Sequence, residues 1–242
     1  MKKLFILLFI GLCLTSTLCA EEALTAKQKE AQKWTESGNA YNSSQQFQNA
    51  IEDYTKAIEL DPKNPWAYSG RGFAYAYSNQ LQEAINDYTK AIELRPPPTL
   101  AALNYCSRGD VYHDLGLNQN AKDDYTKAIE LDPKHAYAYY GRGSVYVQLG
   151  QYHKAEDDFG KAIELNGLSG ENIAKTYFIR GALYAAEKLP TAACDDFYQA
   201  GLLYLKQNNR TKVLECIDYI KKVDSSSYLI QKLSDKIYGE NK

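Results

Sequence analysis

The chain has 242 residues, of which 28 are lysine or arginine and 30 are aspartate or glutamate, giving a formal net charge of −2. This balance, with no basic stripe, excludes the electrostatic pattern of a nucleic-acid-binding protein. The sequence contains no phosphate-binding loop, dinucleotide fingerprint or nucleophile elbow. We therefore predict no enzymatic activity, no cofactor and no nucleic-acid partner.

The first 20 residues indicate a secretory signal peptide. Two lysines near the start precede an apolar run from Leu4 to Leu18, and Ala20 is a small residue just after that run. We predict cleavage after Ala20 and export, with the periplasm as the first choice and secretion or envelope attachment as alternatives. A lipoprotein linked through Cys19 and an uncleaved anchor are further alternatives. No later apolar run is long enough to span a bilayer.

After a polar lead-in at residues 21–30, one pattern returns five times at steps of 34 to 38 residues. Each copy has an aromatic residue, a glycine four positions on and a tyrosine three further on, as in Tyr68, Gly72 and Tyr75. An alanine, an aromatic residue and a second alanine follow at spacings of four and three, as in Ala84 and Tyr88. Each set lies on one face of a helix. Each copy is therefore predicted to be a hairpin of two helices whose apolar faces need neighbours.

The recurring pattern resembles the tetratricopeptide repeat (TPR) family. The resemblance implies an all-α, right-handed superhelical solenoid of antiparallel helix pairs. A final stretch, residues 208–242, lacks the glycine and tyrosine markers and is predicted to form capping helices, because an array must cover its last apolar face. Prolines that follow the second helices mark their ends. The five repeats are predicted at residues 31–64, 65–98, 102–135, 136–169 and 174–207.

A second recurrence departs from the family pattern, which usually has an aliphatic residue before the repeat glycine. Four copies have arginine there, and every copy has aspartate before the aromatic residue of the second helix. Because a buried arginine needs a carboxylate, we expect structural Arg–Asp pairs between packed helices that set the repeat register. A ladder of arginines that binds a ligand is the alternative. The residues are Arg71, Arg108, Arg142, Arg180, Asp53, Asp87, Asp124, Asp158 and Asp196.

In the TPR family the first helices line a concave groove that holds a peptide or a helix. The resemblance therefore implies a non-catalytic scaffold that binds a protein or peptide segment. We expect an aromatic edge to supply apolar area, two aspartates to favour a basic partner, and a histidine between them to add a mild pH dependence. The candidate groove residues are Trp66, Phe73, Tyr77, Asp110, His113, Asp114, Tyr137, Tyr140 and Phe178.

Two other functions are alternatives to peptide binding. One is a structural array that self-associates in the cell envelope, and the other is an accessory subunit of an envelope enzyme. For Trp66 and Tyr137, packing against loops is the alternative to partner binding.

Three cysteines remain after signal cleavage, so the exported chain can form at most one internal disulfide. Cys194 and Cys216 lie on neighbouring predicted helices and could pair. The alternative is that all three, with Cys106, are buried thiols that act as small apolar residues. The cysteines form no paired metal-ligand motif. His113 could share a helix face with Asp110 and Asp114, but a metal site there would need further ligands, and we predict no metal site.

Overall fold

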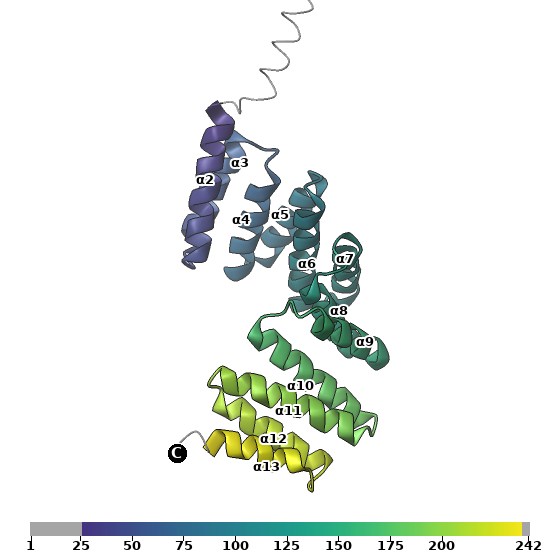
Figure 1. Ribbon diagram of the computed structural model, residues 1–242. Helices are drawn as coiled ribbons and strands as arrows, with labels where there is room; N and C mark the ends of the chain where they lie inside the picture. Colours follow the sequence, from purple (N-terminus) through teal and green to yellow (C-terminus); the bar gives the residue numbers. More distant parts are fainter. Residues whose placement is uncertain (1–25, 239–242) are drawn as a thin grey trace, which may run out of the picture. The chain divides into compact units, whose positions relative to one another are not determined.

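The computed structural model describes residues 26–238, and the regular structure within that range is entirely α-helical, with twelve helices and no strand (Figure 1). The predicted signal peptide lies outside the described residues. Contacts divide the chain after Arg95 into two compact units. Within the described range, no helix is both long enough and apolar enough to cross a membrane.

The first unit contains two helical hairpins. Helix α2 (Ala26–Ser43) packs against α3 (Phe47–Leu60), and α4 (Pro65–Tyr77) packs against α5 (Leu81–Glu93). Helix α2 begins earlier than predicted, so the last five residues of the expected lead-in are helical. Asn64 caps α4, because its side-chain oxygen accepts hydrogen bonds from the backbone N–H groups of Trp66 and Ala67 at 3.0 and 3.3 Å.

The second unit contains three hairpins and a final helix pair, seen from teal to yellow in Figure 1. Both α6 and α10 have 17 residues, whereas α4 and α8 have 13. The insertions between repeats therefore lengthen the next first helix by about one turn. The pairs are α6 (Pro98–Asp114) with α7 (Asn118–Leu131), α8 (Ala136–Gln148) with α9 (Tyr152–Glu164), α10 (Gly170–Ala186) with α11 (Pro190–Lys206), and α12 (Arg210–Val223) with α13 (Tyr228–Tyr238).

The core of each hairpin is built from small residues that face one large ring. Phe159 is fully buried between two alanines of α9, and the first helix approaches it through Gly143. A Cβ on that glycine would lie only 2.9 Å from the Phe159 ring. The close approach of the two helices therefore requires the glycine.

The same ring position also contacts the following hairpin. A Cβ added to Gly141 in α8 would lie 2.5 Å from the ring of Tyr125, which comes from α7 in the preceding hairpin. Where the ring is Phe159 and carries no hydroxyl, the corresponding residue of the next hairpin is Ile179, which packs against the Phe159 core. Gly141 thus leaves room for the larger ring of Tyr125, and Ile179 fills the space beside the smaller ring of Phe159.

The last helix pair closes the second unit. Val213 and Ile217 of α12 and Leu229 and Leu233 of α13 are buried in one core with residues of α10 and α11. Gly201 of α11 lets this pair approach, because a Cβ there would lie 2.5 Å from Leu233. This arrangement covers the apolar face that a sixth repeat would otherwise occupy.

The disulfide considered for Cys194 and Cys216 is not formed in the structure. Both are free and buried, as is Cys106, and the first two belong to the core of the last helices. Burial raises the pKa of the Cys194 thiol and raises that of Cys216 to about 12. These two thiols instead stay neutral and pack as small apolar side chains.

Candidate functional site

The recurring arginines form bidentate pairs with the aspartates. Arg142 donates from Nε to Oδ2 and from Nη2 to Oδ1 of Asp158, both at 2.8 Å. The same two-bond geometry joins the other three arginines to the aspartate 16 positions later, on the second helix of the same hairpin: Arg71 to Asp87, Arg108 to Asp124, and Arg180 to Asp196. These guanidinium groups are therefore engaged within the fold rather than arranged as a ladder for a ligand.

Each arginine also lies between the two tyrosines of its own repeat. The guanidinium carbon of Arg142 is 5.7 Å from the centre of the Tyr139 ring and 5.9 Å from that of Tyr146. The same arrangement surrounds the other three arginines. The repeat tyrosines thus stabilise the charge by cation–π contact as well as filling space.

A further contact of the arginine links neighbouring hairpins. Nη1 of Arg142 donates to the hydroxyl of Thr126 on α7 at 3.3 Å, and Nη1 of Arg71 donates to that of Thr55 on α3 at 3.0 Å. For Arg180 the corresponding residue of the preceding hairpin is Gly160. The Arg–Asp pairs are therefore part of the register between repeats, as well as within each one.

The first hairpin has no arginine at this position. Ser37 occupies it and donates a hydrogen bond to Asp53 at 2.6 Å, while Lys56 approaches the other carboxylate oxygen at 3.1 Å. The Asp53 carboxylate therefore has partners despite the missing arginine.

Three candidate residues of the first unit form an exposed aromatic face on α4. Trp66, Phe73 and Tyr77 expose 54, 37 and 65% of their surface, and their spacings of seven and four residues place them on one side of the helix. Phe47 of α3 joins them, with its ring 5.3 Å from that of Tyr77. Phe73 lies 4.4 Å from the Tyr77 ring. We call Trp66, Phe73 and Tyr77 the α4 aromatic face.

Asp110, expected at the acidic centre of the groove, is half-buried between tyrosine hydroxyls. Tyr125 donates to its Oδ1 at 2.6 Å, and Tyr137 of α8 also donates to it. Burial raises the pKa of Asp110 to about 7; the two tyrosines oppose this shift, and the nearby Asp114 adds to it. The structure therefore holds Asp110 in a buried hydrogen-bond network that joins α6, α7 and α8.

The other second-unit candidates differ in exposure. Asp114 is exposed, and His113 is half-buried with an Nε2 atom that has no hydrogen-bond partner among the described residues. Tyr137 and Tyr140 are half-buried with their rings 5.7 Å apart. Tyr140 also contacts the buried Phe159, at 6.2 Å. Of these four residues, Asp114 alone presents a freely exposed side chain.

Phe178 lies in the packing of the C-terminal helices. Its ring is 5.3 Å from Phe197 of α11 and 5.0 Å from Tyr219 of α12, both edge to face. The cap therefore surrounds a position that the repeat pattern had left free. Sequence spacing could not show this, because the cap lacks the markers that would place its helices.

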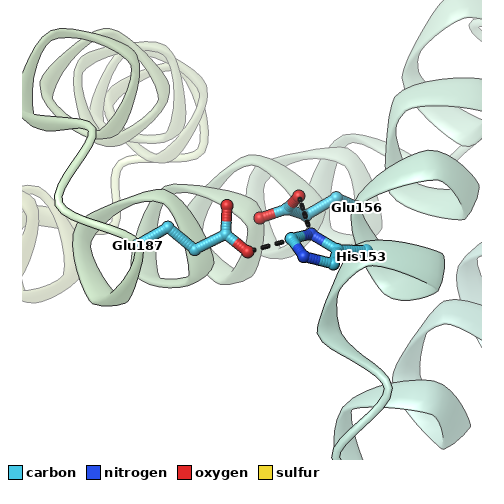
Figure 2. A group of neighbouring side chains, drawn as sticks. All are labelled: His153, Glu156 and Glu187. Carbon is cyan, nitrogen blue, oxygen red and sulfur yellow. Dashed lines mark ion pairs between the residues drawn. The ribbon is translucent and has the colours of Figure 1, made fainter.

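Sequence reasoning missed a group of three polar side chains in the second unit (Figure 2). Nδ1 of His153 on α9 lies 3.0 Å from Oε1 of Glu187 at the end of α10 and 3.7 Å from Oε2 of Glu156. Glu187 lies 34 residues after His153, at the end of the next first helix, and no spacing of the repeat pattern pairs these two positions. The contact between them becomes visible only in the folded chain.

Comparison with known families agrees with this architecture. A family model described as TPR repeat matches residues 38–77 and 109–150, and one described as tetratricopeptide repeat matches residues 65–97 and 136–167. Together with the helical hairpins, these matches show a protein of the repeat-scaffold class. The chain belongs to the TPR family. No curated protein matches it.

Solved structures show the same fold. A crystal structure of MamA is 26% identical, with a TM-score of 0.61, and the match covers 71% of this chain and 96% of that one. PilF of Pseudomonas aeruginosa is 16% identical, with a TM-score of 0.64 and coverage of 88 and 100%. The Cut9–Hcn1 structure is 20% identical, with a TM-score of 0.62, but this chain covers only 42% of its chain.

Proposed function

We propose that this protein is a non-catalytic scaffold that binds a peptide or protein segment through the first helices of its repeats. The observation that carries the proposal is the α4 aromatic face. Three large aromatic side chains on one short helix are left exposed, although the repeat pattern buries comparable rings elsewhere. Exposed aromatic side chains that lie side by side are natural anchors for a partner.

The α4 aromatic face indicates the chemistry of the segment it would bind. Trp66 and Tyr77 each offer a large apolar surface with a polar edge, so apolar side chains of the partner would gain most from covering them. The proposed ligand of this face is thus a segment rich in apolar residues. Asp114, exposed on α6 of the second unit, would separately favour lysine or arginine in a segment bound to that unit.

A displayed library of random peptides, selected against the purified chain, tests this function. Selected peptides should be rich in apolar residues. Trp66→Ala and Tyr77→Ala should each weaken their binding by roughly tenfold or more, as expected for central aromatic anchors, and leave the melting temperature nearly unchanged. Tyr228→Ala is the matched control, because Tyr228 is an aromatic residue that is 71% exposed on α13.

Three outcomes would contradict peptide binding at the α4 aromatic face. The selection could yield no binding peptide, the control could weaken binding as much as Trp66→Ala, or both α4 variants could bind like the original chain. Light scattering on the same proteins separates a further case. If the chain self-associates and Tyr77→Ala makes it monomeric, the face serves self-association, and the proposal that it binds a peptide is wrong.

We also propose that the chain is exported. The support is the lysine-initiated apolar segment that ends at Ala20. Expression in a Gram-negative host followed by fractionation and N-terminal sequencing tests it, and the expected product begins at Glu21 in the periplasmic fraction. A cytosolic product that retains its first 20 residues would overturn the proposal.

A further inference from the structure

The group of His153, Glu156 and Glu187 lies where two consecutive hairpins meet. His153 and Glu156 are three residues apart in the first turns of α9, and Glu187 is the C-terminal capping residue of α10. Figure 2 shows both carboxylates directed toward the imidazole ring, one from each helix. Helices α9 and α10 are packed against each other, so the three side chains are brought together by the contact between the fourth and fifth repeats.

The spacing of the ligand atoms fits one metal ion. One ligand atom from each of the three residues lies within 4.8 Å of both others. Ligands at about 2.1 Å from a tetrahedral ion are about 3.4 Å apart. The His153 side chain is 87% exposed, which leaves room for the small rotations that would bring the three atoms to that spacing.

Glu156 has one carboxylate oxygen without a partner. Its side chain is only 14% exposed, and Oε1 is buried with no hydrogen-bond partner among the described residues. A divalent cation would satisfy the unpartnered oxygen and offset the two negative charges.

We propose that His153, Glu156 and Glu187 bind a Zn²⁺ ion that joins the fourth repeat to the fifth. One imidazole nitrogen with two carboxylate oxygens suits Zn²⁺, which accepts both nitrogen and oxygen ligands, whereas Mg²⁺ and Ca²⁺ prefer oxygen ligands alone. Three protein ligands leave one tetrahedral position for water. The site is independent of the α4 aromatic face, since its residues belong to other helices in the other unit.

Calorimetric titration of the chelator-treated, tag-free chain with ZnCl₂ tests the site. We expect one Zn²⁺ per chain, and a melting temperature raised by about 5 °C or more at a hundredfold excess over the dissociation constant. The same concentration of MgCl₂ should leave the melting temperature unchanged. His153→Ala and Glu187→Gln should each weaken Zn²⁺ binding by at least about tenfold.

Glu164→Gln is the matched control, because Glu164 is an exposed carboxylate at the opposite end of α9. It should bind Zn²⁺ like the original chain. Metal-free melting curves of all variants identify any that fail to fold, and Glu187→Gln alters a 28% exposed side chain whose loss the fold should tolerate.

Two results would overturn the site. The first is the absence of both heat and stabilisation with Zn²⁺, which would leave the three residues as an ion-paired group alone. The second is Zn²⁺ binding that persists unchanged in folded His153→Ala and Glu187→Gln variants, which would place the ion elsewhere in the chain.

Discussion

At the scale of single residues, one arrangement recurs in four hairpins: an arginine pairs with an aspartate and lies between two tyrosines. The side chains of Arg142 and Asp158 are only 17 and 8% exposed. A buried pair of this kind contributes little net stability relative to a well-packed apolar pair. Removing one member, however, leaves an uncompensated charge in a place that water hardly reaches. The pair therefore contributes mainly to specificity, because a shift of one helix along the other would separate the charges.

Arg142→Met and Asp158→Leu should each lower the free energy of unfolding by about 3 kcal/mol. The double variant should lose less than the sum, with a coupling energy of at least about 1 kcal/mol. Urea unfolding followed by circular dichroism measures all four proteins. The exposed pair Lys161 and Glu164, 2.9 Å apart, is the control and should couple by only about 0.5 kcal/mol. Equal coupling in the two pairs would contradict the structural role.

The ionisation of Asp110 makes the stability of the folded chain depend on pH. Its pKa is raised in the folded chain to about 7, whereas an unfolded aspartate has a pKa of about 3.9. As the pH rises between these values, the unfolded chain releases this proton before the folded chain does, so ionisation favours unfolding. The contribution of Asp110 to stability is therefore highest at acidic pH and is lost as the pH rises toward and above 7.

Asp110→Asn should remove this loss of stability at higher pH. The asparagine keeps an oxygen that can accept a hydrogen bond from the Tyr125 hydroxyl. Relative to the original chain, the variant should become more stable as the pH is raised from 5 to 8. Melting temperatures across that range measure the difference, and Asp218→Asn, which alters an exposed carboxylate on α12, is the control. A difference between Asp110→Asn and the original chain that stays constant with pH would show that Asp110 is ionised throughout.

At the scale of helices, packing rather than helix propensity decides which glycines are needed. Gly141 and Gly160 both lie inside helices, where alanine is favoured by roughly 1 kcal/mol in isolation. Their surroundings differ. A Cβ at Gly141 would lie 2.5 Å from the Tyr125 ring, whereas one at Gly160 would lie 3.7 Å from Nη1 of Arg180, an ordinary contact.

Gly141→Ala should destabilise the chain by about 1–3 kcal/mol, because the buried ring that it strikes has no space to move into. Gly160→Ala should stabilise it by about 0.5–1 kcal/mol. Chemical unfolding of the two variants side by side tests the pair. If both substitutions shift stability in the same direction, the close contact between α8 and Tyr125 does not limit that position.

At the scale of the whole molecule, the chain divides into two units at Arg95 and Pro96. The first unit has two hairpins and no capping pair, whereas the second has three hairpins and the final pair α12 and α13. Repeat proteins gain stability from contacts between neighbouring hairpins, and about three repeats are needed for a stable array. The two units should therefore differ in their ability to fold alone.

A fragment of residues 96–242 should be helical by circular dichroism and melt cooperatively. A fragment of residues 26–95 should show weaker helicity and no sharp transition. A third fragment, residues 136–242, lacks α6 and α7, which exposes the face of α8 that packs on α7, and it should melt at a lower temperature than 96–242. If fragment 26–95 melted cooperatively at the same temperature as fragment 96–242, two hairpins would be shown to suffice for a stable fold.

The candidate partner-binding residues show how far a repeat pattern predicts a site. The exposure of Trp66, Phe73 and Tyr77 follows from positions that the pattern leaves unused. The same argument applied to Phe178 and Asp110 did not foresee their surroundings. The cap covers Phe178, and two tyrosine hydroxyls from neighbouring helices hold Asp110. A free position in one repeat becomes buried whenever a neighbouring element reaches it.

The sequence by itself determined the helices, their pairing within each repeat, and the pairing of the recurring arginines with recurring aspartates. The structure selected the partner, which is the aspartate 16 positions later in the same hairpin. These features depend on helical periodicity and on a short connection, which are local properties. Only the tertiary structure decided that His153 meets Glu187, that Cys194 and Cys216 are free thiols, and that the cap covers Phe178. These outcomes depend on the distance and angle between hairpins, which the packing of many side chains sets together.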